Sequence, residues 1–410
     1  MKYVIIGNST AAVGCVEGIR QVDKEGSITI LASEPHHVYS RPLISYLLYG
    51  KTDEQRMKYR PDSFYEDNNV TALLGKTAVS IDKEQKIVVL DDGQRIPYDK
   101  LLLATGSKPF IPPMKGLDNV EKKTTFMSLD DAKRLAAMLT PDSKVLIIGA
   151  GLIGLKCMEG IHHMVKNITI IDLADRILPS ILDETGSAMI QSYLEQKGIQ
   201  FILGTSASEL TAHSATLKDG TVLDFDVLVV AVGVRPNLEL AQEIGAKTGR
   251  AIEINSKSET SIPDVYAAGD CCECYDIAAD VVRVLAILPN AYQQGEAAGI
   301  NMAGGSREFN KAIPMNAIGF FDYHIITAGS YDGEAHIAKS DHTYKKLVTK
   351  DNRLIGYILI GEIERAGIYT SLIREKTPLD TIDFDLIFEH PQLMAFSKTE
   401  RAKKLGGAKL

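Results

Sequence analysis

The stretch KVLIIGAGLIG, residues 144–154, decides the fold. Its first five residues, Lys144–Ile148, are a lysine followed by valine, leucine and two isoleucines, and this apolar run predicts a buried strand. The next six residues, 149–154, have the spacing GxGxxG, which suits a tight turn where backbone N–H groups meet a pyrophosphate and a helix packs on the strand. A helix from Leu155 to about Val165 and a second strand at 168–172 complete a βαβ unit. This unit ends on Asp172, 172 − 149 = 23 residues after the first glycine, where an acid can accept from a ribose hydroxyl, so we predict a dinucleotide-binding unit.

The N-terminus carries a weaker copy of this pattern. A strand at 3–6 is followed by GNSTAA at 7–12, a helix to Arg20, and a second strand at 27–33. The turn is degenerate, because Ser9 and Ala12 stand where the other copy has glycine. The copy is supported by Glu34, which lies 34 − 7 = 27 residues after Gly7.

Two such units in one chain indicate two nucleotides held face to face. One chemical reason for this arrangement is hydride transfer from a nicotinamide to a second redox cofactor, most simply a flavin. Further strands are predicted in KLLLATGS at 100–107, LVVAVGVRP at 228–236 and VYAAGD at 265–270. A helix is expected to start directly after Asp270, so this residue either caps that helix or binds a polyol hydroxyl.

The composition is that of an ordinary globular protein. The chain has 410 residues, and a prior of about 150 residues per domain suggests two or three domains. The net charge, 45 − 53 = −8, argues against a nucleic-acid binder. No apolar segment reaches the roughly 20 residues of a membrane span, and Glu17 and Arg20 interrupt the apolar N-terminus. We therefore expect no membrane partner and a cytoplasmic protein.

Cysteine and histidine clusters do not predict a metal site. Three of the five cysteines, Cys271, Cys272 and Cys274, lie together, but adjacent cysteines rarely suit one tetrahedral centre and a fourth ligand is missing. Packing at the expected helix start is the favoured interpretation, with a lowered thiolate pKa as the alternative. The histidines at 36–37 and 162–163 are sequence neighbours, which do not face one point.

Several motifs resemble those of a known family, the flavoprotein reductases with two dinucleotide-binding domains, also called pyridine nucleotide-disulfide oxidoreductase-like proteins. Within it the chain is most similar to NADH:rubredoxin oxidoreductases and the flavin domain of nitrite reductase large subunits. The resemblance covers nearly the whole chain and is carried by GNSTAA at 7–12, YSRPLISYLL at 39–48, LLLATGSKP at 101–109, GAGLIG at 149–154, ADRILPSILD at 174–183, VAVGVRPN at 230–237, TSIPDVYAAGD at 260–270, PNAYQQGEAAGINMAG at 289–304 and LIGYILIGEIERAGIYTSLIREK at 354–376.

The resemblance implies an α/β fold with two Rossmann-like three-layer dinucleotide-binding domains, for FAD and NAD, and a small α+β C-terminal domain. The FAD-binding domain would be discontinuous, at 1–108 and 237–310. The NAD-binding domain would span 109–236, and a rubredoxin-reductase-like domain would span 311–410.

The same resemblance assigns the cofactor-binding residues. At the nucleotide end of FAD, Gly7, Ser9 and Ala12 would cradle the pyrophosphate, Glu34 would hold the adenosine ribose, and Ala78 would contact adenine through its backbone. Arg41 and Pro42 would lie beside the flavin, and Thr105 and Gly106 would close over the cofactor. Asp270 would bind the ribityl or pyrophosphate region. For NAD, Gly149, Gly151 and Gly154 would face the pyrophosphate, Asp172 the ribose, and Gly233 the nicotinamide side.

The acid at the end of the second βαβ unit also bears on the choice of nucleotide. A carboxylate at Asp172 accepts from a 2′-hydroxyl and repels a 2′-phosphate, whereas Arg176 could attract that phosphate. NADH is favoured, because the carboxylate would sit at the strand end itself.

Two positions depart from the family pattern. The stretch 39–45 has no cysteine beside the expected flavin, so no redox-active disulfide or sulfenic acid is available there. The family usually has a glutamate two residues after the third glycine, where it pairs with a flavin-side lysine, and here that position is Lys156. Lys156 either stabilises negative charge on a reduced flavin or is simply solvated, and both interpretations stay open.

These features favour an FAD-dependent NADH oxidoreductase in which the flavin carries the chemistry and no side chain is a catalytic nucleophile or base. Arg41 and Lys156 would contribute only flavin-side electrostatics. Electrons would pass to a small redox protein, rubredoxin or an iron–sulfur protein. The alternatives are an NADH oxidase that reduces dioxygen and an NADH-oxidising flavin subunit of a larger complex. The sequence does not specify the oligomeric state.

Overall fold

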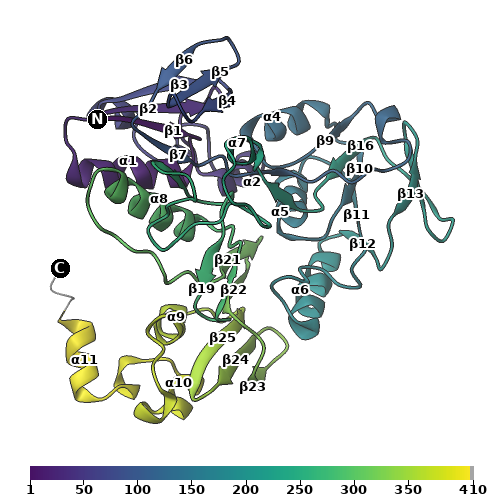
Figure 1. The fold of residues 1–410 in the computed structure, drawn as a ribbon. Helices are drawn as coiled ribbons and strands as arrows, with labels where there is room; N and C mark the ends of the chain where they lie inside the picture. Colours follow the sequence, from purple (N-terminus) through teal and green to yellow (C-terminus); the bar gives the residue numbers. More distant parts are fainter. Residues whose placement is uncertain (407–410) are drawn as a thin grey trace. The chain divides into compact units, whose positions relative to one another are not determined.

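The computed structural model describes residues 1–406, which form two compact units (Figure 1). Unit 1 contains Met1–Cys274 and Ala286–Phe309, and unit 2 contains Tyr275–Leu285 and the chain from Asn310 onward. Apart from residues 275–285, both predicted dinucleotide-binding domains lie in unit 1, so the border between them stays a prediction. The segment Tyr275–Leu285 groups with the C-terminal part of the chain, whereas the sequence placed it in the FAD-binding domain.

A five-stranded parallel sheet, the first sheet, forms the N-terminal half of unit 1 in the order β18-β7-β1-β2-β3. Its strands are β1 (Lys2–Ile6), β2 (Ser27–Ala32), β3 (Val70–Leu74), β7 (Lys100–Leu103) and β18 (Val265–Ala267). An antiparallel sheet of β4 (Ala78–Asp82), β5 (Ile87–Leu90) and β6 (Arg95–Pro97) interrupts the chain between β3 and β7. The helices of this half are α1 (Thr10–Val22), α2 (Ile44–Leu48), α3 (Phe64–Asp67), α7 (Glu239–Glu243) and α8 (Leu288–Met302).

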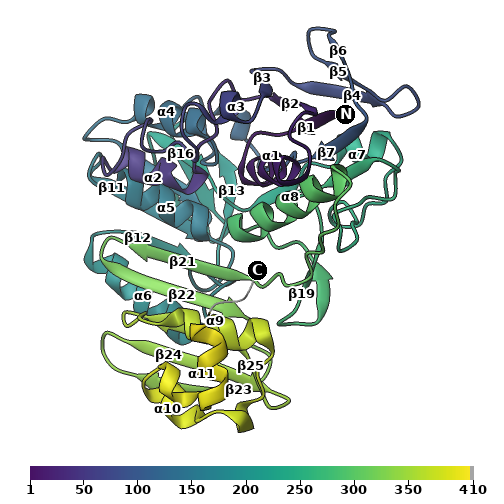
Figure 2. The same ribbon diagram turned by 90° about the vertical axis from the view of Figure 1, so that its left-hand side faces the viewer.

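Helices α1 and α8 lie side by side against the first sheet (Figure 2), and glycines set their close approach. A Cβ at Gly295 would stand 2.0 Å from the carbonyl oxygen of Ala11, and one at Gly299 would stand 2.1 Å from that of Cys15. Such distances leave no room for a methyl group. Two helices that are 265 residues or more apart in sequence, 288 − 22 = 266, are thereby fixed against each other beneath the phosphate turn.

A second parallel sheet repeats this architecture in the order β12-β11-β10-β16-β9. Its strands are β9 (Lys123–Thr124), β10 (Lys144–Ile148), β11 (Asn167–Asp172), β12 (Gln200–Leu203) and β16 (Val227–Val230). The antiparallel sheet of β13 (Ala207–Leu210), β14 (Ser214–Leu217) and β15 (Val222–Asp224) interrupts the chain at the corresponding place. The helices are α4 (Leu129–Met138), α5 (Leu152–Ile161) and α6 (Glu184–Gln196).

The two glycine turns are built by equivalent backbone hydrogen bonds. Gly7 N donates to Leu31 O and Gly149 N to Ile171 O, each at 2.8 Å. Both glycines have positive φ, 125° and 117°, and a Cβ on either would collide with the carbonyl oxygen of a neighbouring loop at 2.1–2.3 Å. Only glycine fits at either position.

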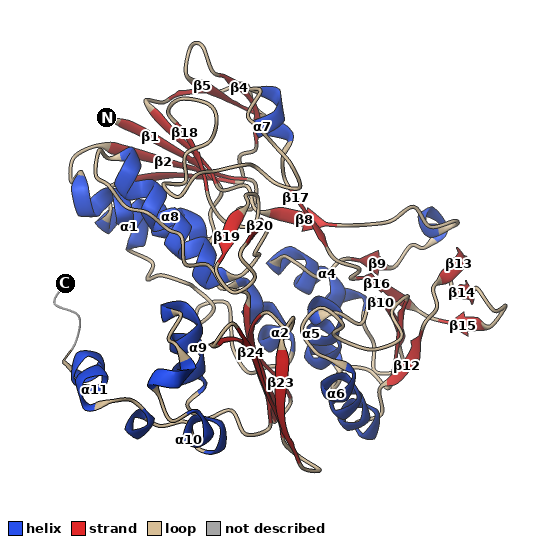
Figure 3. Cartoon of the chain, turned by 60° about the horizontal axis from the view of Figure 1, so that its bottom comes forward, coloured by secondary structure: helices blue, strands red, loops and turns tan. Residues whose placement is uncertain are grey.

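The chain crosses between the two sheets on a two-stranded antiparallel ribbon, β8 (Ser107–Pro109) and β17 (Val234–Pro236), which Figure 3 shows in red. Each strand follows the terminal turn of a central strand, β7 or β16. The ribbon therefore joins the carboxyl ends of both parallel sheets, the edge at which open α/β sheets bind ligands.

Unit 2 is an α+β structure around an antiparallel sheet in the order β21-β22-β25-β24-β23. Its elements are β21 (Met315–Phe320), β22 (Tyr323–Gly329), β23 (Glu334–Lys339), β24 (Tyr344–Lys350), β25 (Arg353–Ile360), α9 (Ala366–Glu375), α10 (Phe384–Glu389) and α11 (Lys398–Leu405). The hairpin of β19 (Cys274–Asp276) and β20 (Val281–Arg283) contributes Ile277 to the same core. The predicted fold class, two Rossmann-like domains and a small α+β domain, is confirmed.

One local prediction, the bounds of a helix, needs correction. The helix after the second glycine turn spans Leu152–Ile161, whereas we expected it from Leu155 to about Val165. It begins at Leu152 because Gly151 is already its N-cap residue. Among residues 1–406, no helix is long and apolar enough to cross a membrane.

Candidate functional site

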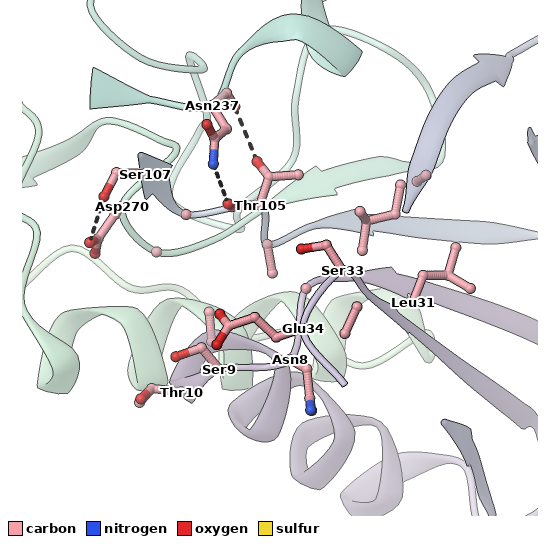
Figure 4. A pocket seen from close by; sticks show the side chains of 18 of the residues that line it. Asn8, Ser9, Thr10, Leu31, Ser33, Glu34, Thr105, Ser107, Asn237 and Asp270 are labelled. Atoms are coloured by element: carbon pink, nitrogen blue, oxygen red, sulfur yellow. Dashed lines mark hydrogen bonds between the residues drawn. The ribbon is translucent and has the colours of Figure 1, made fainter. Parts of the chain in front are cut away.

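A cavity of about 410 Å³ lies at the carboxyl ends of the first sheet. Its lining comes from the glycine turn, the ends of β2 and β7, the loop after β18 and the start of α8. Of the predicted FAD-binding residues, Gly7, Ser9, Glu34, Arg41, Ala78, Thr105, Gly106 and Asp270 line it. Figure 4 shows Glu34 and Ser9 near the turn, and Ser107, Thr105 and Asp270 on other parts of the wall.

Ala12 and Pro42 are not part of this lining. Ala12 is fully buried within the packing of α1, which is the place that the sequence pattern gives to the third small residue. Pro42 lies next to Arg41 in a short 3₁₀ turn, Arg41–Leu43. These two residues shape the wall without contributing its surface.

The start of α1 offers backbone donors to this cavity. Its N-cap is Ser9, whose side chain makes no capping hydrogen bond. The first N–H groups of a helix have no partner within the helix, and together with the helix dipole they favour an anion such as a phosphate. The adjacent Asn8 is held in place by its side chain, which donates to His36 O at 3.2 Å and accepts from Tyr65 Oη at 2.9 Å. The turn thus fits the pyrophosphate of a dinucleotide.

Glu34 and Arg41 form a salt bridge with each other at the wall of the cavity. Both side chains are partly exposed, at 25% and 33%. The sequence placed Glu34 on the ribose and Arg41 beside the flavin, and did not predict that they pair. They meet because the loop after β2 returns through Tyr39, whose hydroxyl hydrogen-bonds with both.

Asp270 faces the cavity and does not cap a helix. The helix expected directly after it is absent, and the next helix, α8, begins at Leu288. The residues after Asp270 instead pair with Ile252: Ile252 N donates to Cys271 O, and Glu273 N donates to Ile252 O. The carboxylate accepts from Ser107 Oγ at 3.4 Å (Figure 4). Burial raises the pKa of Asp270, against the opposing effects of Ser107 and Arg41.

Thr105 and Gly106 lie where β7 leads into the crossing ribbon. Asn237, at the far end of the ribbon, donates its side-chain N–H to Thr105 O at 2.8 Å, and Thr105 Oγ1 donates to Asn237 O at 3.1 Å (Figure 4). Gly106 has a φ of 63°. These reciprocal bonds close one side of the cavity.

The second glycine turn has open space where a pyrophosphate would lie. A Cβ at Gly151 would meet nothing within 4 Å, whereas one at Gly154 would stand 2.0 Å from Gly149 O. The second glycine therefore leaves the turn accessible, and the third allows the close approach of helix and strand. Gly233 lies across from this turn in the loop after β16, and Gly233 O accepts from Phe110 N at 2.9 Å.

Asp172 ends β11 with its carboxylate already bonded to the backbone. It accepts from Ala150 N at 2.6 Å and from Ala174 N at 2.8 Å. A carboxylate has about four acceptor positions, so ribose hydroxyls can still bind. Arg176, the alternative determinant, pairs with its neighbour Asp175 at 3.2 Å.

The two acids do not occupy equivalent positions. Ile6 pairs with Leu31 and Ile148 pairs with Ile171, so the position equivalent to Asp172 in the first copy is Ala32. Glu34 lies two residues further along the chain, beyond the strand end.

Lys156 is not a freely solvated residue. It forms a salt bridge with Glu159, whose side chain is only 4% exposed, and its Nζ lies 4.5 Å from the centre of the Tyr46 ring. Tyr46 belongs to α2, so this contact joins α2 to α5. The interpretation of Lys156 as a solvated helix residue was therefore wrong.

All five cysteines lie within the described residues, where they are buried and form no disulfide bond. Cys271 and Cys272 lie in the turn after Asp270 and Cys274 begins β19, so they are not at a helix start as expected. Burial raises the pKa of the Cys15 and Cys157 thiols. Within residues 1–406, no group of three or more His, Cys, Asp or Glu side chains is arranged to hold a metal ion.

Sequence reasoning missed several residues of the cavity wall: Asn8, Tyr39, Ser107, Asn237 and Leu288. Asn8 and Tyr39 lay inside motifs that were already recognised, and Asn237 directly follows the Val-Arg-Pro of the crossing ribbon. All five residues lie inside or directly before a recognised motif, and this position was the only signal that the sequence offered.

Comparisons with known proteins agree with this geometry. The family model described as "Pyridine nucleotide-disulphide oxidoreductase" matches residues 1–295, and that described as "Rubredoxin NAD+ reductase C-terminal domain" matches residues 314–377. The chain belongs to the pyridine nucleotide-disulphide oxidoreductase family. An oxidoreductase of this family, with FAD and a pyridine nucleotide as cofactors, is what the sequence predicted, and the membership confirms it.

Curated relatives match over nearly the whole chain. Nitrite reductase [NAD(P)H] of Bacillus subtilis is 31% identical over 92% of this chain and 48% of the relative. Subunit epsilon of the NADH-dependent phenylglyoxylate dehydrogenase of Aromatoleum evansii is 30% identical over 92% of both chains. The chain thus spans about half the length of the nitrite reductase that it matches.

A solved structure confirms the fold. The chain aligns with the covalent putidaredoxin reductase–putidaredoxin complex at a TM-score of 0.87 and 23% identity, covering 95% of this chain and 96% of the other.

Proposed function

We propose that the protein is an FAD-dependent oxidoreductase that takes hydride from NADH and passes electrons to a small redox protein such as rubredoxin. The observation that carries this proposal is the presence of two glycine turns in unit 1. One of them opens into a cavity lined by Glu34, Arg41 and Asp270. FAD, when bound, supplies the ring that receives hydride and then releases electrons to an acceptor. The protein's task is to hold and orient two nucleotides.

The residues of the first turn and cavity would hold FAD. Gly7 and Ser9 present backbone N–H groups to the pyrophosphate, with Ala12 packing beneath them. Glu34 accepts from the adenosine ribose, Ala78 contributes backbone, and Asp270 accepts from the polyol region. Arg41 and Pro42 lie beside the flavin, and Thr105 and Gly106 close over the cofactor.

The residues of the second turn would hold NADH. Gly149, Gly151 and Gly154 form the pyrophosphate site, and Gly233 borders the nicotinamide side. Asp172 favours NADH over NADPH, because its carboxylate, held at the strand end by two backbone N–H bonds, accepts from a 2′-hydroxyl and repels a 2′-phosphate. Arg176 pairs with Asp175, which makes it a weaker attractant for that phosphate.

A protein acceptor is supported by two features. The segment 39–45 contains no cysteine and the five cysteines are buried, so we expect the flavin to pass its electrons directly to the acceptor. The match of residues 314–377 to the rubredoxin NAD+ reductase C-terminal domain favours rubredoxin. We expect the reaction to take place in the cytoplasm.

A second candidate function is that of an NADH-oxidising flavin subunit in a larger complex. It is supported by the epsilon subunit from Aromatoleum evansii, which matches this chain over 92% of both lengths. The same cofactor residues would serve it, and only the electron acceptor would differ.

The experiment begins with the purified full-length chain. It should be yellow, and heating should release FAD; release of FMN, or a chain that cannot be loaded with FAD, would overturn the proposal. NADH oxidation is then followed with rubredoxin, with a two-iron ferredoxin and with dioxygen as sole acceptors. We expect the fastest turnover with rubredoxin. Turnover with dioxygen alone at an equal rate would indicate an NADH oxidase, and turnover restored only by a co-purifying protein would indicate a subunit.

A further inference from the structure

The hydroxyl of Tyr39 makes three hydrogen bonds at the wall of the cofactor cavity. It donates to Glu34 Oε2 at 2.6 Å, and it accepts from Arg41 Nη1 at 3.3 Å and from Leu129 N at 3.0 Å. One donor and two acceptors are the full capacity of a hydroxyl group. Tyr39 is only 7% exposed, so no water is needed to complete this set.

Two of these partners belong to the proposed FAD site. Glu34 and Arg41 line the cavity and form a salt bridge with each other. Arg41 also donates to Met127 O at 3.3 Å, and its guanidinium lies 5.4 Å from the centre of the Tyr39 ring. Tyr39 therefore contacts the pair both through its hydroxyl and through its ring face.

The third partner belongs to the other half of unit 1. Leu129 is the first residue of α4, which lies in the chain between strands β9 and β10 of the second sheet. The N-cap Ser128 and Asp131 form a capping box that satisfies other N–H groups at this helix start. Leu129 N finds its acceptor in Tyr39.

We propose that Tyr39 is a positioning residue that orients Glu34 and Arg41 toward the cofactor and ties the FAD cavity to the first turn of α4. Its ring fills space, and its hydroxyl oxygen contacts the ribose-binding acid Glu34, the flavin-side cation Arg41 and the start of α4 at the same time. The inference rests on the proposed function only in that the cavity binds FAD.

The variant that isolates this role is Tyr39→Phe, because it removes one oxygen and keeps the ring. Glu34 then loses the hydrogen bond that the Tyr39 hydroxyl donates, and the N–H of Leu129 loses the oxygen that accepts from it. A hydrogen bond to a charged group is worth enough that we expect FAD to bind at least tenfold more weakly. Affinity is measured by titrating FAD into the FAD-free folded chain.

The matched control is Tyr3→Phe. Tyr3 is also buried, at 1% exposure, and its hydroxyl also donates to a carboxylate, Asp23, at 2.8 Å. Tyr3 does not line the cavity. We expect this variant to lose stability but to bind FAD as tightly as the wild-type chain.

A double-mutant cycle separates positioning from general destabilisation. If Tyr39 acts through Glu34, then adding Tyr39→Phe to Glu34→Gln should weaken FAD binding no further than about the larger single change, because neighbours in one network are not additive. Additive losses would overturn the inference, as would unchanged FAD affinity in Tyr39→Phe. A wild-type chain that binds no FAD at all would instead overturn the proposed function.

Hydrogen exchange tests the link to α4 without any variant. We expect FAD binding to the wild-type chain to slow exchange of the Leu129 amide, because the cofactor fixes the pair that holds Tyr39. The control is the amide of Gly186, which bonds to the cap of α6, Asp183, at 3.0 Å. Equal exchange at Leu129 with and without FAD would overturn the link.

Discussion

At the scale of single residues, Asp172 carries the choice of nucleotide. Replacing it by alanine removes the carboxylate that would bind the ribose, and we expect kcat/KM for NADH to fall roughly tenfold or more. Because Asp172 also accepts from Ala150 N, the same change disturbs the glycine turn. The measurement is therefore made with both nucleotides: a loss confined to NADH supports the carboxylate's role, and equal losses for NADH and NADPH would assign Asp172 to turn structure alone.

The cysteines should prove dispensable for electron transfer. All five are buried, and none lies in the segment 39–45. A variant with every cysteine changed to serine or alanine should keep NADH-dependent dye reduction per bound FAD, although altered core packing lowers its unfolding midpoint. Stopped-flow measurements separate flavin reduction from its reoxidation. Normal reduction with blocked reoxidation would show that the thiols at 271–274 relay electrons.

Residues in local motifs were predictable from the sequence, and residues held by tertiary contacts were not. Gly7 and Glu34 follow strands of the first βαβ unit, Asp270 follows the separate strand at 265–267, and all three line the cavity. The salt bridge between Glu34 and Arg41 depends on the hydroxyl of Tyr39 and on the start of α4. No spacing rule relates residue 39 to residue 129, so this network was invisible in the sequence.

At the scale of elements, the contact between α1 and α8 is limited by glycine. In Gly299→Ala the new methyl group would lie 2.1 Å from Cys15 O, so the two helices must separate. Overpacking of this kind costs about 1–3 kcal/mol, and we expect a lower unfolding midpoint and a lower FAD content. The control is Gly367→Ala in α9, where a Cβ meets nothing within 4 Å and alanine favours the helix by up to about 1 kcal/mol. Equal midpoints for the two variants would contradict the close packing of α1 on α8.

The turn before β18 predicts a pH dependence. Asp264 accepts from Lys100 Nζ and Lys86 Nζ, each at 2.5 Å, and these bonds lower the pKa of its carboxyl. A depressed pKa stabilises the fold above the unfolded-state pKa, and that contribution is lost as the pH falls through the lower folded-state value. The substitution Asp264→Asn removes the charge of this residue, and asparagine tolerates its φ of 66°, so the backbone of the turn is not strained. We expect it to reduce stability by about 0.5–1 kcal/mol at pH 7 and to flatten the loss of stability below about pH 4. The free energy of unfolding is measured against pH for both proteins, and an equal loss of stability below about pH 4 in both would contradict this prediction.

The elements themselves were largely predictable, because apolar runs and glycine turns are local signals. The exception follows Asp270, where we expected a helix and the chain instead pairs with Ile252. A Gly-Asp pair after a strand fits both a helix cap and a turn. The choice is made by an isolated β-bridge to Ile252, 270 − 252 = 18 residues earlier, which local reasoning does not include.

At the scale of the whole molecule, the sequence predicted the repeated architecture but not the path of the hairpin. The residues 275–285 were assigned to the FAD-binding domain by their place in the chain, yet Ile277 lies in the core of unit 2 and its N–H donates to Ala312 O at 3.0 Å. Asp276 in the same hairpin is fully buried, bonded to Arg283 and to Ala278 N. The C-terminal unit is thus built from two separate segments, and a core of that kind cannot be read from sequence order.

Two residues that line the cavity flank the hairpin in the sequence, Asp270 before it and Leu288 after it. A chain that ends at Phe309 removes the core on which Ile277 packs but keeps the hairpin, so we expect it to aggregate and to retain little FAD. A second truncated chain, with 275–285 replaced by a Gly/Ser linker of equal length, lacks the exposed apolar residues and should hold FAD more fully. FAD content per folded chain and light scattering are measured for both, with the full-length chain as reference. Equal FAD content in the two truncated chains would show that the hairpin does not depend on the C-terminal core, and that the cavity closes without it.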